Sequence, residues 1–140
     1  MTTILMIRHA LTDSAGKHLT GRSPGIHLNE EGRKQALNLA QRLSSSHISS
    51  VYSSPLERAV ETAEPIAGKH GISCEIIEDL NEIDLGSWTN FFIDELRNDE
   101  RFRLFNSWRS GVRVPGGENI AEVQIRAIRA IENICSVNPE

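Results

Sequence analysis

The residues best suited to chemistry in this chain are Arg8 and His9, which directly follow the apolar run Ile4 to Ile7. Four bulky apolar residues in a row are typical of a strand that is buried on both faces of a parallel sheet. Open α/β sheets bind their ligands at the carboxyl ends of such strands. A fixed cation beside an imidazole at that place indicates an anionic substrate and a nucleophile or base. Taken alone, an Arg-His pair is more simply explained as the end of a strand, so the rest of the chain has to decide.

A second guanidinium and a carboxyl group occupy equivalent places further along. Arg58 lies one turn into a helix that follows an expected strand, where backbone N–H groups already favour anions. Two arginine forks that converge on one spot suit the oxygens of a phosphoryl group. Glu82 follows the next expected strand, and a carboxyl group close to a bound phosphate can act as a proton donor.

The elements that must position these groups alternate between strand and helix. Strands are expected over residues 4–7, 48–52 and 72–77, with one helix after an Asn29 N-cap and a second begun by Ser54 and Pro55. This second helix is kinked or ended by Pro65 and closed by Gly71. The β-α-β-α-β order predicts an α/β fold, a three-layer α/β/α sandwich with a mostly parallel sheet.

The remainder predicts one domain over residues 1–140, with an irregular helical lid or cap at 89–114. Glu118 and Asn119 open an amphipathic helix whose apolar face needs a sheet to cover. We expect a further strand after that helix, and the chain stops at residue 140 without one. The sequence therefore looks truncated at its C-terminus.

Composition excludes several classes of partner. The net charge is −4, and no apolar run is long enough to span a bilayer, so neither nucleic acid nor a membrane is expected as a partner. Cys74 and Cys135 form no CxxC motif and are expected to be reduced thiols in a cytoplasmic protein. No metal site and no cofactor are expected, because the remaining histidines fit no metal-ligand spacing. These are His18, His27, His47 and His70.

Several short motifs, in order along nearly the whole chain, together resemble the histidine phosphatase superfamily, in its phosphoglycerate mutase-like branch. They are Arg8-His9, Gly21-Arg22, Leu28, Gly32, Gln35-Ala36, Ser53-Ser54-Pro55-Leu56 with Arg58 and Thr62-Ala63, Glu82 with Gly86 and Trp88, and Pro115-Gly116-Gly117-Glu118.

The resemblance implies a phosphatase that hydrolyses phosphomonoesters through a phosphohistidine, or a phosphomutase-like relative. It implies that His9 is the nucleophile and Glu82 the proton donor. Arg8 and Arg58 would bind the phosphoryl oxygens in place of a metal ion. Thr12, Gly21 and Arg22 are candidate substrate contacts, and the ligand would be a small phosphorylated metabolite or inorganic phosphate.

Two departures from the family pattern leave an alternative open. Residue 10 is Ala where Gly is commonest, and the Ser-His-Gly turn that supplies a second catalytic histidine is absent from the 140 residues. The alternative is a catalytically impaired fragment that binds anions or self-associates, for example as a homodimer through an exposed sheet edge. A nucleotide-binding role is the least favoured, because no glycine-rich phosphate-loop motif is present.

Overall fold

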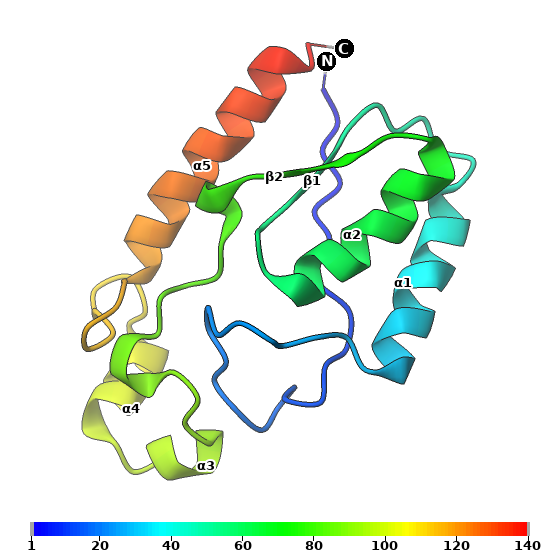
Figure 1. The fold of residues 1–140 in the computed structure, drawn as a ribbon. Coiled ribbons are helices and arrows are strands. Elements are labelled where there is room, and N and C mark those ends of the chain that lie inside the picture. Colours follow the sequence, from blue (N-terminus) through cyan, green and yellow to red (C-terminus); the bar gives the residue numbers. More distant parts are fainter. Residues whose placement is uncertain (1, 140) are drawn as a thin grey trace.

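The computed structural model describes residues 2–139, which form helices around a short parallel sheet. The order is α1 (Glu30–Leu43), β1 (Val51–Ser53), α2 (Glu57–His70), β2 (Cys74–Ile76), the 3-10 helices η1 (Glu78–Leu80) and η2 (Gly86–Trp88), then α3 (Ile93–Leu96), α4 (Glu100–Ser107) and α5 (Ile120–Val137). Figure 1 shows α1 and α2 together on one side of the strands and α5 on the other. The predicted α/β class is confirmed.

Helix boundaries follow the local signals at most ends. Asn29 caps α1, and its side chain accepts a hydrogen bond from the backbone N–H of Gly32, as predicted. Asn119 caps α5 in the same way and forms a capping box with Glu122. Gly71 ends α2 in the left-handed conformation, with φ of 67°.

The predicted start of the second helix is wrong by two residues. α2 begins at Glu57, and its cap is Leu56, whose carbonyl accepts the N–H groups of Ala59 and Val60. The Ser54 side chain therefore caps nothing; burial of Leu56, which is 8% exposed, explains why the turn closes there. Helix α2 continues through Pro65 and is not ended by it.

The sheet is smaller than predicted. β1 and β2 pair in parallel, with Val51 opposite Cys74, whereas residues 4–7 form no strand. These four side chains are exposed, Met6 to 81%. A strand is buried on both faces only when neighbouring strands and helices cover it, and within residues 2–139 none pairs with this segment. The prediction of a buried strand at residues 4–7 is therefore wrong for the described structure.

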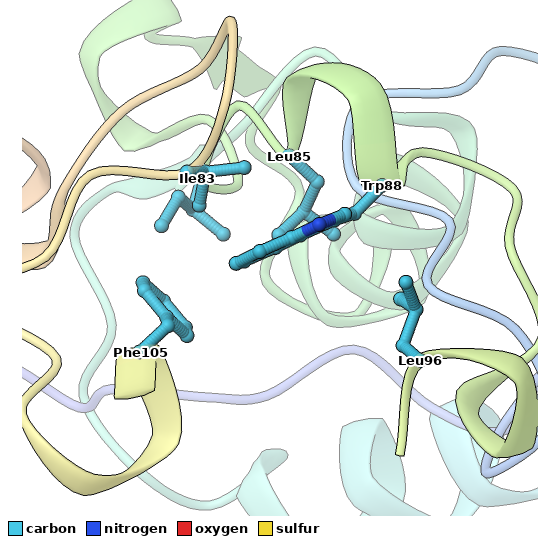
Figure 2. Packing of buried hydrophobic residues seen from close by; sticks show 6 residues of the cluster. Ile83, Leu85, Trp88, Leu96 and Phe105 are labelled. Carbon is cyan, nitrogen blue, oxygen red and sulfur yellow. The ribbon is translucent and has the colours of Figure 1, made fainter. Parts of the chain in front are cut away.

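Residues after the sheet build a hydrophobic core cluster. The rings of Phe102 and Phe105 stand edge-on to Trp88, with centroids 5.3 and 5.6 Å away. Figure 2 shows Trp88 between Leu85 and Phe105, with Leu96 on the side of α3. This packing fastens α3 and α4, which lie within the predicted lid or cap segment at residues 89–114, to the loop after η1. Their action as a lid stays a prediction.

Candidate active site

The imidazole of His9 is held by the backbone of the next residue, Ala10. Its Nδ1 lies 2.8 Å from the carbonyl oxygen of Ala10, and the side chain is half-buried. A carbonyl oxygen can only accept a hydrogen bond, so Nδ1 is the nitrogen that carries the proton in the neutral ring. Nε2 therefore keeps its lone pair and is the nucleophilic atom of this side chain.

Helices α1 and α2 fasten the backbone that follows His9. The N–H of Ala10 donates to the hydroxyl of Thr62 at 3.0 Å, and the N–H of Leu11 donates to the side chain of Gln35 at 3.1 Å. Gly32 lets the chain approach this closely, because a Cβ there would lie 2.0 Å from the carbonyl oxygen of Leu11. The predicted nucleophile, His9, thus stands on a loop that two helices hold in place.

Arg58, on the first turn of α2, is the buried cation of the site. It is 2% exposed, and its Nη2 donates to the carbonyl of Gly21 at 2.7 Å. Its Nη1 is buried without a hydrogen-bond partner in the part of the chain that the structure describes. Burial lowers the pKa of Arg58, while the charges of Glu82 and Glu57 act to raise it. A buried guanidinium nitrogen with an unused donor is a place for an anionic oxygen.

Glu82 lies within the electrostatic reach of Arg58, on the loop between η1 and η2. Its carboxylate accepts the N–H of Ile83 at 2.9 Å, and the residue is exposed. Its carbonyl accepts from Arg22 Nε at 2.8 Å and from Arg126 Nη2 at 3.0 Å. The backbone of Glu82 is thus tightly bound while its carboxyl group faces solvent.

The other predicted site residues lie in different surroundings from one another. Arg8 is exposed and takes part in none of the side-chain hydrogen bonds or ion pairs found among residues 2–139. The buried hydroxyl of Thr12 pairs with that of Ser14 at 2.9 Å. Arg22 is bound to Glu118 and Glu82, so much of its guanidinium is engaged inside the protein. Across residues 2–139, no three His, Cys, Asp or Glu side chains gather as a metal site.

Sequence reasoning missed the supports of the site. Thr62 and Glu118 appeared only as parts of motifs, and Arg126 was not singled out. A signal for Arg126 was available: it lies on the apolar stripe of α5, three residues after Val123 and four before the buried Ala130. A charged residue on a buried helix face is normally paired.

Comparisons with known proteins show the family to which this chain belongs. The model of the histidine phosphatase superfamily (branch 1) matches residues 4–140. The chain is 33% identical to phosphoserine phosphatase 1 of Hydrogenobacter thermophilus, over 96% of this chain and 64% of that protein. It is 37% identical to phosphoglycerate mutase-like protein 4 of Arabidopsis thaliana, over 94% of this chain and 59% of that protein. The chain thus spans about three-fifths of these relatives' lengths.

Solved structures give the same result. A mycobacterial glucosyl-3-phosphoglycerate phosphatase superposes with a TM-score of 0.84 at 27% identity, covering 94% of this chain and 63% of that one. Structures of that phosphatase have been solved with inorganic phosphate and with VO3. The sequence match and the shared fold agree on one family. The chain belongs to the histidine phosphatase superfamily.

Proposed function

We propose that this chain carries the nucleophile, phosphate and acid sites of a metal-independent phosphomonoesterase, or of a phosphomutase-like relative, with His9 as the nucleophile. The observation that carries the proposal is the buried Arg58, whose Nη1 has no hydrogen-bond partner among residues 2–139 and whose pKa the charge of Glu82 acts to raise. The named phosphatases among the relatives support the same chemistry. The substrate is a small phosphorylated metabolite.

In the first step, His9 Nε2 attacks phosphorus and the bond to the ester oxygen breaks. Glu82 gives its proton to that oxygen, so the alcohol leaves neutral and the phosphoryl group stays on His9. In the second step, water attacks the phosphohistidine, Glu82 takes up a proton from the water, and inorganic phosphate leaves. Arg58 and Arg8 stabilise the charge of the phosphoryl oxygens in both steps. In a mutase-like relative an acceptor alcohol takes the place of water.

The test is turnover of p-nitrophenyl phosphate with a chelator present, by wild type, His9→Ala and His47→Ala. His47 is exposed on the loop before β1 and serves as the matched control. Turnover that survives the chelator and the control substitution but is lost in His9→Ala supports the proposal. An acid-labile phosphoenzyme should form in wild type and not in His9→Ala. Full activity of His9→Ala would refute the assigned nucleophile.

A second candidate is an anion-binding module that self-associates without turnover. The exposed apolar side chains at residues 4–7 favour this candidate, because exposed apolar patches commonly mark protein–protein contact surfaces. A homodimer that binds phosphate, does not hydrolyse the ester and keeps its affinity in His9→Ala would favour this candidate. Light scattering and phosphate titration measure these two properties.

We also propose a reducing, cytoplasmic compartment, supported by the free cysteines Cys74 and Cys135.

A further inference from the structure

Arg126 of α5 is the most heavily bonded side chain near the site, and the chemistry proposed above does not use it. Its side chain is 15% exposed. Nε and Nη2 bind the two carboxylate oxygens of Glu118 at 3.1 and 3.0 Å. Nη1 donates to the carbonyls of Asp79 and Asn81 at 2.8 and 2.6 Å, and Nη2 to that of Glu82 at 3.0 Å. A guanidinium has five N–H donors, and all five are therefore occupied.

Three of these five bonds fall on one short stretch of backbone. The carbonyls of Asp79, Asn81 and Glu82 all turn toward α5, so a single side chain fixes the direction of the peptide groups leading up to Glu82. Beyond η1, residues 81–85 have no regular secondary structure, and such loops normally sample several conformations. Here its acceptors are drawn to one charged group, which holds the loop in a single arrangement.

Glu118 completes the arrangement from the other side. Its Oε2 accepts the N–H of Asp84 at 3.0 Å and Arg22 Nη2 at 2.9 Å, and its own N–H donates to the carbonyl of Asp84 at 3.0 Å. Burial acts to raise the pKa of Glu118, but the hydrogen bonds from Arg126 and Asp84 and the charges of Arg126 and Arg22 lower it overall. Glu118 therefore remains ionised and keeps Arg126 oriented. Gly117 permits the close contact, since a Cβ there would lie 2.2 Å from the carbonyl of Asp84.

We infer that Arg126, oriented by Glu118, is a positioning residue that sets where the Glu82 carboxyl stands relative to the phosphate bound at Arg58. Arg22 belongs to the same unit: its Nε shares the Glu82 carbonyl with Arg126, and the preceding residue, Gly21, binds Arg58. The phosphate-binding arginine and the proton donor are thus connected through residues 21–22. This inference rests on the proposed function for its role in catalysis, but the arrangement of the loop can be measured separately.

The catalytic test compares two leaving groups. p-Nitrophenolate leaves as a stable anion and needs little proton donation, whereas the alkoxide of β-glycerol phosphate needs a proton from Glu82. Glu82→Gln should lower kcat for the alkyl ester by about 10²-fold or more. Arg126→Met should lower the same kcat by about 10- to 100-fold, through misplacement of the acid, and leave the aryl ester much less affected. KM for both esters should change little, because Arg58 is untouched.

Two further variants separate positioning from simple loss of structure. Arg126→Lys keeps the charge but not the planar fork, so it should restore part of the alkyl-ester activity lost in Arg126→Met. Arg129→Met is the matched control: Arg129 is exposed on the same helix and makes no side-chain hydrogen bond within residues 2–139. It should match wild type on both esters. An equal loss on the two esters in Arg126→Met and Arg126→Lys would overturn the inference.

Hydrogen exchange decides the question even for a chain that turns over neither ester. In Arg126→Met, or in Arg126→Lys if the first variant does not fold, the amides of residues 79–84 should exchange faster by about tenfold, while those of α1 and α2 keep their wild-type rates. Faster exchange in a chain without turnover would retain the positioning role and reject the proposed function. Unchanged exchange at residues 79–84 would reject the positioning role whatever the activity.

Discussion

Thr62→Val isolates the link between helix α2 and the loop that carries His9. The Thr62 hydroxyl is buried, 4% exposed, and it accepts the N–H of Ala10 at 3.0 Å and donates to the carbonyl of Arg58 at 2.7 Å. Valine has nearly the same shape but no hydroxyl, so the half-buried N–H of Ala10 loses its partner. Leaving such a donor unpaired costs about 1–3 kcal/mol. At about 3 °C per kcal/mol for a chain of this length, Tm should fall by roughly 3–10 °C.

The same substitution should also affect catalysis, because the carbonyl of Ala10 orients the His9 ring. A loosened loop misplaces Nε2, and we expect kcat for p-nitrophenyl phosphate to fall by about 10- to 100-fold. Thr62→Ser is the control: it removes one methyl group, at a cost of about 1 kcal/mol, and keeps both hydrogen bonds. Thermal denaturation and kcat are measured on all three proteins. If Thr62→Val is as active as Thr62→Ser, the hydroxyl does not hold the loop and the reasoning fails.

Three further predictions concern pH, backbone strain and packing. The hydrogen bond and charge of Glu61 raise the pKa of His27 above 6.5. Burial acts to raise the pKa of Glu61, but the hydrogen bonds from His27 and from the N–H of Leu28 lower it below 4.5 overall. The contribution of His27 to the free energy of unfolding is complete below pH 6.5 and is lost as the pH rises through the raised pKa of His27. The contribution of Glu61 is lost as the pH falls below 4.5. His27→Gln should therefore lower Tm most between these values and little at about pH 9, so a Tm difference that does not change with pH would contradict the ion pair. Asn90 has φ of 67°, which strains any residue but glycine, and its side chain accepts a hydrogen bond from Ser23 Oγ. In urea denaturation Asn90→Ala should be less stable than Asn90→Gly by about 1 kcal/mol, and equal midpoints would argue against backbone strain at this residue. Trp88 is 3% exposed, so Trp88→Ala should lower the free energy of unfolding by about 3–5 kcal/mol, and Trp88→Phe should lower it distinctly less. A much smaller loss in Trp88→Ala would mean that the aromatic cluster collapses into the space left by the ring.

Local chemistry determined much of this protein before any tertiary contact was known. Asn29 and Asn119 cap helices because their side chains satisfy N–H groups within three residues, and Gly71 ends α2 because glycine adopts positive φ without strain. The α/β class followed from the alternation of expected strands and helices, and the family from the order of short motifs along the chain. His9 and Arg58 could be singled out because each follows an expected strand, where ligands of such folds bind.

The tertiary structure decided what holds those groups in place. Whether residues 4–7 form a buried strand depends on neighbours that cover them, and the apolar pattern alone does not contain those neighbours. Arg126 lies 44 residues from Glu82 in the chain, yet it binds the carbonyl of Glu82. Backbone carbonyls are common to every residue, so their partners leave no mark on the sequence. The sequence marks Arg126 as a charged residue on an apolar helix face, but only the packing of α5 against η1 brings its guanidinium to the loop and decides its partners.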